Sequence, residues 1–379
     1  MMAVEYDVII VGAGPSGSTC AYNIKRLYGD ARVLLIDQAT FPRYKPCGGG
    51  ISPEAKAYVD FDLLPAIDYV CRDIVMVANK KEIEAREYPL WMVRRDLFDD
   101  YLVKQAEKKG VTFLSQTTVQ NVVSEKEGVR VETNNGHFTA QYAVLAEGGK
   151  GRLAKKLGID PNNNVLAALE YEHYTDELNG KLYIDFDYSD TGYAWNFPKS
   201  NGLSCGIGGL IKGKNKEKVG LPQRLRDYMQ QYDVKTLDKK NLHGHPIQIY
   251  SGRKKLMHDR IALVGEIAGC VDPLTAEGIR PAMKSGYLAA EAIAKTLTSQ
   301  KIKDFQSYDK HFHQLIGRDM RYASYVAYFL NHYKKQVLPL LSKKTAINGF
   351  MSVFSGEKTY REKVSLRRLV QFVWAACVK

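Results

Sequence analysis

The beginning of the chain alternates between apolar runs and a glycine-rich turn. Tyr6–Val11 reads Y-D-V-I-I-V, a β-branched run typical of a buried strand. Gly12–Gly17 follows at once, and residues 18–28 can form a helix. Arg32–Ile36 is a second apolar strand, and it ends at Asp37. This order predicts a βαβ unit, the opening of a parallel sheet.

The pattern changes along the rest of the chain. Further apolar runs predict strands at 73–78, 111–114, 118–123, 128–133 and 142–146. Residues 165–210 hold several strands separated by turn signals, which indicates a mostly antiparallel sheet. Spacing and composition predict helices over Arg95–Lys109, Lys216–Tyr232, 276–298 and 302–333, with more helix towards Lys379. Between them, Arg260–Val264 returns to a short buried strand.

This order of elements predicts an α/β fold in which one domain interrupts another. We expect a discontinuous Rossmann-like nucleotide-binding domain made of residues 1–72, 95–160 and 255–300. We expect a substrate domain, built on the antiparallel sheet, made of residues 73–94 and 161–254. Residues 301–379 would then form a helical C-terminal region.

Composition changes this picture mainly through charge. The 379 residues carry 54 Lys and Arg against 42 Asp and Glu, a net charge of +12, and their 45% hydrophobic content excludes a disordered chain. Residues 301–379 hold 15 basic and 5 acidic residues, so +10 of the net charge lies there. A basic region of this kind predicts contact with an anionic surface such as a membrane, and a solvated helical surface is the alternative. No recognised nucleic-acid-binding module accompanies it, so no nucleic-acid partner is expected.

The C-terminal region offers two amphipathic stretches. One is an aromatic stripe at helical spacing, formed by Tyr322, Tyr325, Phe329 and Tyr333. We expect it to pack against the body of the protein, and an interfacial helix on a membrane is the alternative. Leu366–Val378 is a second interfacial candidate.

The cysteines and the termini bear on location. The six cysteines include no C-x-x-C pair and no accompanying histidine cluster, so neither a metal site nor a disulfide framework is expected. Met1–Asp7 lacks the pattern of a signal peptide, and Leu369–Val378 is too short to span a bilayer. We therefore expect a cytoplasmic protein, with peripheral contact at the inner face of the membrane as an option.

The glycine-rich turn has the spacing G-x-G-x-x-G and the context that a dinucleotide site requires. Gly12 permits a tight turn, Gly14 lets the backbone approach a pyrophosphate, and Gly17 allows close packing of the helix. Pro15 and Ser16 lie in this turn, and the N-terminal end of the helix that follows offers unpaired N–H groups to phosphate oxygens. Asp37 follows 20 residues after Gly17 and can accept a hydrogen bond from a ribose hydroxyl. NAD and FAD share this half of the molecule, so the motif predicts either.

A distant segment favours FAD. A strand feeds Gly265-Glu266, and a long helix begins after Gly278. A second helix N-terminus placed against a ligand suits the flavin end of a long dinucleotide. Glu266 can hold ribityl hydroxyls, and the Gly278 backbone can approach the isoalloxazine ring.

These segments resemble the FAD-dependent oxidoreductases of the p-hydroxybenzoate hydroxylase fold. Residues 265–279 are similar to the family segment G-D-A-A-x-x-x-x-P-x-x-x-x-G-I, with Pro273 and Ile279 in place and Glu266 where aspartate is usual. Residues 95–99 match an arginine followed by a Phe-Asp pair, which implies that Arg95 contacts the ribityl or phosphate region. The resemblance implies further cofactor contacts at Glu147, Gly148 and Val119.

Two more motifs resemble those of geranylgeranyl reductases. Residues 46–52 are similar to their Cys-Gly-rich-Ile-Ser motif, which implies that Cys47, Gly48 and Gly49 lie near the flavin. Residues 193–199 match the motif Y-x-W-x-F-P, with Asp190 where the family has a leading proline. The resemblance runs from residue 6 to about residue 285 and implies an apolar substrate cavity lined by Tyr193, Trp195, Phe197 and Pro198.

The resemblance implies an FAD-dependent reductase of carbon–carbon double bonds in a prenyl or other hydrophobic lipid, by hydride transfer from flavin N5. Cys47, Tyr193 and Trp195 are its candidate catalytic residues, and a structural thiol is the alternative for Cys47. A flavin monooxygenase or halogenase, or a membrane-associated electron carrier, are the alternative functions.

The electron donor stays open among NAD(P)H, ferredoxin and flavodoxin, because the chain has only one dinucleotide fingerprint. Two basic residues near the glycine-rich loop, Arg43 and Lys45, are expected to be solvated. Contact of this pair with an acidic donor or a substrate diphosphate is the alternative.

Overall fold

A computed structural model describes residues 4–85, 88–159, 164–176, 179–210, 220–234, 236–252, 255–341 and 343–363. Leu366–Val378 and Cys377 lie outside these residues. The other five cysteines are free thiols. Among the described residues, no helix is both long enough and apolar enough to cross a membrane.

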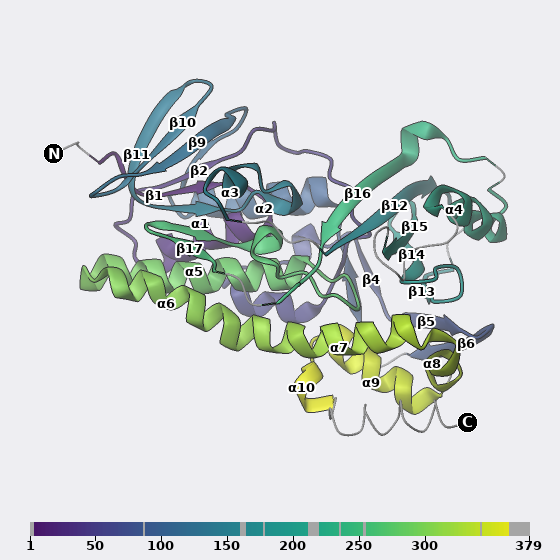
Figure 1. The fold of residues 1–379 in the computed structure, drawn as a ribbon. Helices are drawn as coiled ribbons and strands as arrows, with labels where there is room; N and C mark the ends of the chain where they lie inside the picture. The colour runs from purple at the N-terminus through teal and green to yellow at the C-terminus, as the bar shows by residue number, and fades with distance from the viewer. Residues whose placement is uncertain are drawn as a thin grey trace.

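The first sheet begins with the βαβ unit expected from the sequence. Its strands run in the order β17 (Met257–His258), β18 (Ile261–Leu263), β11 (Gly136–Leu145), β1 (Tyr6–Val11), β2 (Val33–Ile36) and β8 (Thr112–Leu114). From β18 to β8 all neighbours are parallel. β10 (Val129–Thr133) and β9 (Val119–Ser124) extend β11 as an antiparallel pair, seen in Figure 1 as a projecting meander. Because β1 and β2 are covered on both faces, their residues are almost entirely apolar.

The second sheet is mostly antiparallel. Its order is β16 (Leu242–Gln248), β12 (Val165–Tyr174), β15 (Gly202–Leu210), β14 (Tyr193–Lys199), β13 (Lys181–Asp185), β5 (Asp73–Ala78) and β6 (Lys81–Ala85). Only the β13–β5 pairing in this sheet is parallel. A small sheet of β3 (Gly50–Ile51), β7 (Leu90–Met92) and β4 (Tyr69–Cys71) lies beside it.

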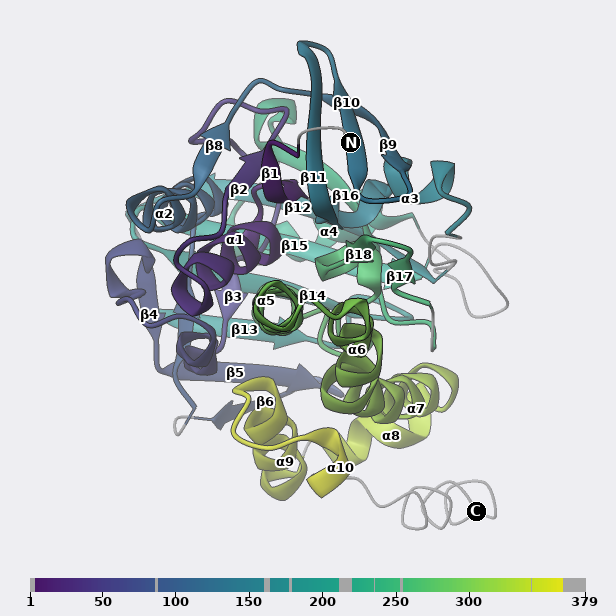
Figure 2. The same ribbon diagram turned by 90° about the vertical axis from the view of Figure 1, so that its left-hand side faces the viewer.

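The helices before the C-terminal region are α1 (Pro15–Leu27), α2 (Arg95–Lys108), α3 (Arg152–Lys156), α4 (Leu221–Met229) and α5 (Ile279–Ser299). Figure 2 shows α1 and α5 side by side in the centre of the molecule. Their contact is close enough that a Cβ atom added to Gly286 would lie 2.1 Å from the carbonyl oxygen of Ser16. A glycine in α5 thus sets how closely α5 lies on the start of α1.

The C-terminal helices are α6 (Ile302–Phe312), α7 (Arg318–His332), α8 (Lys334–Leu341), α9 (Lys344–Phe354) and α10 (Tyr360–Lys363). A π-helical turn over His313–Gly317 joins α6 to α7, so the helix predicted over 302–333 is one rod with a local bulge. α9 buries Ile347, Met351 and Phe354 in the core beneath the second sheet. The fold class expected from the sequence is confirmed: a Rossmann-like sheet, an antiparallel sheet and a helical C-terminal region.

The aromatic stripe of α7 packs against the body in part: Tyr322 contacts a small core formed by Ala323, Val353 and Tyr360, whereas Tyr325 is exposed. The buried positions of this helix are Met320, Ala323, Ala327 and Leu330. Tyr325 is 42% exposed and its neighbour Tyr328 is 57% exposed. Small side chains let α7 approach the body closely, and this turns part of the aromatic face towards solvent.

Candidate functional site

A cavity of about 510 Å³ lies where the two sheets meet. On one side, its wall comes from the carboxyl ends of β1, β2 and β11 and from the starts of α1 and α5. On the other side, it comes from β12, β14 and β16, with Phe354 of α9 contributing at one point. Ligands of open parallel sheets bind at the carboxyl ends of the strands, so this is the expected place for a nucleotide.

The glycine-rich turn forms one wall of the cavity and has no room for side chains. A Cβ atom on Gly12 would lie 2.3 Å from the carbonyl oxygen of Ala146, and one on Gly17 would lie 1.9 Å from the carbonyl oxygen of Gly12. Gly12 also has a φ of +104°, which L residues rarely adopt. Gly14 is the N-cap of α1 and has no side chain to occupy the first-turn N–H groups. The Gly12 and Ala13 N–H groups are bonded to the Ile36 carbonyl and to Asp37, so it is the N-terminal end of α1 that offers backbone donors to the cavity.

Asp37 ties the glycine-rich turn to the end of β2. Its two carboxylate oxygens accept hydrogen bonds from the Ala13 N–H at 2.8 Å and the Ala39 N–H at 2.9 Å. The side chain also lines the cavity. Each oxygen keeps a further lone pair, so the carboxylate can accept a hydroxyl donor without giving up either backbone bond.

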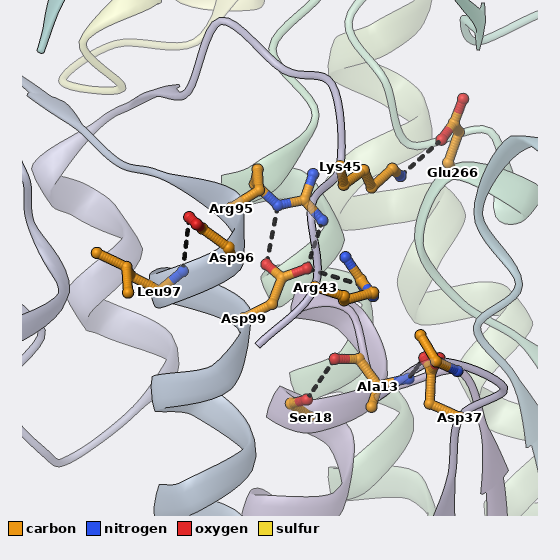
Figure 3. A network of polar contacts seen from close by, with 11 residues as sticks. Ala13, Ser18, Asp37, Arg43, Lys45, Arg95, Asp96, Leu97, Asp99 and Glu266 are labelled. Carbon is orange, nitrogen blue, oxygen red and sulfur yellow. Dashed lines mark hydrogen bonds and ion pairs between the residues drawn. The ribbon is translucent and has the colours of Figure 1, made fainter. Parts of the chain in front are cut away.

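A buried cluster of two arginines and one aspartate lies beside the turn (Figure 3). Arg95 donates from Nε to Asp99 Oδ1 and from Nη2 to Asp99 Oδ2, both at 2.8 Å. Arg43 Nη2 reaches the same Oδ2 at 2.9 Å. Burial alone would raise the pKa of Asp99, but the Arg95 and Arg43 guanidiniums lower it below its usual range. One carboxylate against two guanidiniums leaves a net positive charge next to Gly14.

The expectation that Arg43 and Lys45 are solvated is wrong. Their side chains are only 17% and 26% exposed, and both line the cavity. Lys45 Nζ lies 4.0 Å from Glu266 Oε2, and burial lowers the pKa of this lysine. Arg43 Nη1 is buried without a hydrogen-bond partner among the described residues. This donor is suited to an anionic ligand.

Glu266 lines the cavity near Lys45 and is held by the end of β16. Its Oε1 accepts the Gln248 N–H at 2.9 Å, and a Cβ atom on Gly149 would lie 2.4 Å from the same oxygen. Gly149 thus makes room for the carboxylate. Glu147 points elsewhere and caps α3, where it accepts the N–H groups of Leu153 and Ala154 at 2.8 and 3.1 Å.

The loop after Cys47 is fixed by a buried lysine that the sequence did not single out. Lys199 Nζ donates to the carbonyl oxygens of Gly48 at 2.7 Å and Val93 at 2.9 Å. Burial lowers the pKa of Lys199. A lysine at the end of an apolar strand, directly after the motif Y-x-W-x-F-P, is the signal that was available in the sequence.

Glu170 is a second residue that the sequence reading missed. It lies in β12, is 4% exposed and accepts the Cys47 N–H at Oε2 over 2.8 Å. Its other oxygen accepts the Ser204 hydroxyl at 2.5 Å. The available signal was an acidic residue at a buried position of a strand that is otherwise apolar there.

The aromatic residues of β14 divide between two places. Tyr193 and Trp195 line the cavity, and the Tyr193 hydroxyl donates to the Thr275 carbonyl. The Trp195 indole lies over Gly206, where a Cβ atom would come within 2.1 Å of Cζ2. Phe197 instead packs on the Cys47–Gly50 loop, 3.1 Å from the position of a Cβ atom on Gly48.

Most residues proposed from the sequence line this one cavity. They are Gly12, Gly14, Pro15, Ser16, Asp37, Cys47, Gly48, Gly49, Arg95, Val119, Glu147, Gly148, Tyr193, Trp195, Glu266, Gly278 and Ile279. Five others lie outside its lining: Gly17, Gly265, Pro273, Phe197 and Pro198. Gly17 and Gly265 are packed behind the wall, since a Cβ atom on Gly265 would lie 2.4 Å from Ser16 Oγ. Among the described residues, His, Cys, Asp and Glu side chains form no group that could hold a metal ion.

Two known proteins align with nearly the whole chain. An uncharacterized protein of Methanosarcina barkeri is 31% identical over 331 residues, which are 86% of this chain and 84% of that protein. The digeranylgeranylglycerophospholipid reductase of Methanococcus vannielii is 27% identical over 365 residues, covering 86% of this chain and 88% of the reductase. The chain belongs to the geranylgeranyl reductase family. The predicted class, an FAD-dependent oxidoreductase of this family, is confirmed.

Solved structures share the fold of this geranylgeranyl reductase family member. The geranylgeranyl bacteriochlorophyll reductase-like protein of Thermoplasma acidophilum superposes with a TM-score of 0.79 at 22% identity, over 97% of this chain and 99% of that one. A myxobacterial chondrochloren halogenase superposes with a TM-score of 0.70 at 20% identity, over 93% and 90%. A family model of lycopene cyclase proteins also matches residues 7–176. The fold is therefore common to several chemistries.

Proposed function

We propose that this chain binds FAD in the cavity and reduces carbon–carbon double bonds of a prenyl or other hydrophobic lipid. One observation carries the proposal: the same cavity is lined by the bare glycine-rich turn at Gly12–Gly14 and by the aromatic residues Tyr193 and Trp195. The Cys47–Gly50 loop lies between these two parts, since Gly48 packs against Trp195. A polar nucleotide and an apolar substrate would then meet near this loop.

The residues present fit FAD. The glycine-rich turn, together with the unpartnered Nη1 of Arg43, would hold the pyrophosphate, and Asp37 the adenosine ribose. Glu266 would hold ribityl hydroxyls, and the start of α5 at Gly278 would meet the flavin ring. In its reduced form FAD supplies hydride, and the protein orients the substrate, excludes water and supplies protons.

The substrate part of the cavity suits an isoprenoid chain. Tyr193, Trp195, Ile247, Val271 and Phe354 line it with large apolar surfaces. The reductase relative is named for a lipid with two geranylgeranyl chains. An extended unsaturated chain in this place would bring a double bond to the Cys47–Gly50 loop.

The electron donor is proposed to be NAD(P)H, ferredoxin or flavodoxin. We also propose that the basic C-terminal region contacts the membrane peripherally, since a lipid substrate has to be taken from there. The exposed Tyr325 and Tyr328 of α7 support this, because tyrosine is favoured at membrane interfaces.

The test is reduction of a lipid by the purified protein. Flavin absorbance would be recorded, and the protein, reduced anaerobically with dithionite, would be mixed with geranylgeranyl diphosphate or a geranylgeranyl glycerolipid. We expect the mass spectrum of the lipid to gain two hydrogens for each bond reduced. Unchanged lipids would favour an electron carrier, and oxygen or halogen incorporated in air would favour the monooxygenase or halogenase alternative.

A further inference from the structure

Five carboxyl groups line the cavity in the described part of the chain, and four of them are held by backbone N–H groups or by a guanidinium. Asp37, Glu147 and Glu266 accept backbone N–H groups at 2.8–3.1 Å. Glu277 accepts two hydrogen bonds from the Arg280 guanidinium, at 2.9 and 2.6 Å. These four carboxyl groups are thus engaged by backbone donors or by a guanidinium of their own surroundings.

Glu170 has a different environment. It is almost fully buried, and its recorded partners are a hydroxyl, from Ser204, and a single backbone N–H, from Cys47. The nearby cation, Lys199, directs its hydrogen bonds to the carbonyl oxygens of Gly48 and Val93. The hydrogen bonds that Glu170 accepts therefore come from uncharged donors.

The charges around Glu170 act in both directions. Burial raises its pKa, and the neighbouring Glu172 raises it further. The Ser204 hydroxyl, the Lys199 ammonium and the Cys47 N–H lower it. The net direction is upward, which keeps a proton on the carboxyl to a higher pH than in water.

Glu170 also faces a second, smaller cavity of about 100 Å³. This cavity is lined mainly by polar side chains, which include Tyr44, Glu172, His173, Tyr174 and Ser204. Tyr44 and Tyr174 are 48% and 54% exposed, so the second cavity lies close to solvent. Glu170 lines both cavities and is thus placed between solvent and the site of reduction.

Reduction of a double bond requires a proton as well as a hydride. The π bond breaks, the hydride forms a C–H bond at one carbon, and a proton forms a C–H bond at the other. We propose that Glu170 donates this proton and regains one from solvent through the second cavity. The O–H bond of the carboxyl breaks and leaves a carboxylate, while the reduced flavin is oxidised by two electrons. This inference rests on the proposed function.

The variant Glu170→Gln tests the inference because it keeps the size and the acceptor oxygen but carries no acidic proton. We expect unchanged flavin content and melting temperature, with oxidation of the reduced protein by geranylgeranyl lipid slowed by a factor on the order of 100. The control Glu84→Gln changes a glutamate of the same sheet whose side chain is 41% exposed, and it should react like the wild type.

A readout independent of activity is the infrared band of a protonated carboxyl. In a pH titration the wild type should keep a C=O band to a higher pH than an ordinary glutamate does, and Glu170→Gln should lack this band while Glu84→Gln keeps it. Ser204→Ala removes a hydrogen bond that favours the carboxylate, so this band should persist to higher pH.

The outcomes separate the two proposals. A Glu170→Gln variant that reduces the lipid within twofold of the wild-type rate overturns the donor role and leaves the proposed function standing. So does a wild-type spectrum without the band. A wild type that leaves every prenyl lipid unreduced overturns both. If the Cys47→Ala variant loses activity while Glu170→Gln retains it, the thiol is the proton source and our assignment is wrong.

Discussion

Arg95 and Asp99, one turn apart in α2, form a bidentate ion pair with both hydrogen bonds at 2.8 Å. Asp99 is fully buried, and it also pairs with Arg43. The spacing i, i+4 allowed the pair to be foreseen as a helical contact. Arg43 lies 56 positions before Asp99 in the chain, so its contact with Asp99 could be known only from the tertiary structure.

Asp99→Asn should be strongly destabilising, by about 3–5 kcal/mol, because it leaves two buried guanidiniums without their carboxylate. The neighbouring variant Asp100→Asn breaks only the surface pair with Lys104, whose side chain is 62% exposed, and should change stability by less than about 0.5 kcal/mol. Urea unfolding of both variants at pH 7 measures the difference. Similar losses in the two variants would contradict this account.

The same pair predicts a dependence on acid. The pKa of Asp99 is lower in the folded protein than in the unfolded chain, so its ionisation stabilises the fold above the unfolded pKa. This contribution is lost as the pH falls through the folded pKa. Wild type and Asp99→Asn should therefore converge in unfolding free energy at acidic pH, and denaturation series from pH 7 downward would show whether they do.

Gly286→Ala should destabilise the contact between α1 and α5. Its Cβ atom would lie 2.1 Å from a backbone oxygen, which requires the helices to move apart. Gly349→Ala in α9 is the matched control, since no atom lies within 4 Å of its Cβ position and alanine favours a helix by about 1 kcal/mol. We expect a lower melting temperature and weakened flavin binding for the first variant only. Flavin titration of the two purified variants checks this, and equal affinities would count against the packing argument.

Asp272→Asn should stabilise the protein at neutral pH. Burial raises the pKa of Asp272 from 3.8 to about 6. Between these two pH values the unfolded state has released the proton of Asp272, while the folded state still holds it. Relative to the variant, the wild type loses stability as the pH rises through this window, by up to about 3 kcal/mol. The amide keeps the Oδ1 acceptor for the Leu274 and Thr275 N–H groups.

Unfolding free energies of wild type and Asp272→Asn from pH 4 to pH 7 should therefore diverge with rising pH. The variant Asp30→Asn, at an exposed position, should run parallel to the wild type. A constant difference between Asp272→Asn and the wild type would show that Asp272 does not titrate in this range.

Phe354→Ala should widen the range of accepted chain lengths, because Phe354 closes the cavity from α9. Phe350→Ala is the control: this ring stacks on Phe354 with centroids 5.9 Å apart but does not line the cavity. Phe354→Ala should lose packing on the order of 3–5 kcal/mol, and Phe350→Ala should lose less, since Phe350 is only partly buried. Rates with prenyl lipids of different length should shift towards longer chains in Phe354→Ala alone. A shift of equal size in both would assign the effect to loosened packing.

Local spacing was enough to predict the nucleotide end of the site. The glycine-rich turn, its flanking strands and Asp37 occupy 32 consecutive residues from Tyr6, and each requirement there is local: a turn without Cβ atoms, a helix start, an acid at the end of a strand. The alternation at Tyr193 and Trp195 likewise placed two aromatic side chains on one face of a strand. The same rule put Phe197 on that face, but the Cys47–Gly50 loop covers it.

Only the tertiary structure decided which charged groups are buried at the site. Glu170 meets a loop 123 positions earlier, and Lys199 reaches Gly48 over 151 positions. For each residue the local signal was a charge within an apolar strand, and this signal names neither the partner nor the loop that buries it. Both residues are buried because the second sheet contacts the Cys47–Gly50 loop, and the two segments lie far apart in the chain. The sequence by itself determined that a glycine-rich turn and an aromatic strand exist, and long-range packing determined that they share one cavity that a buried acid also lines.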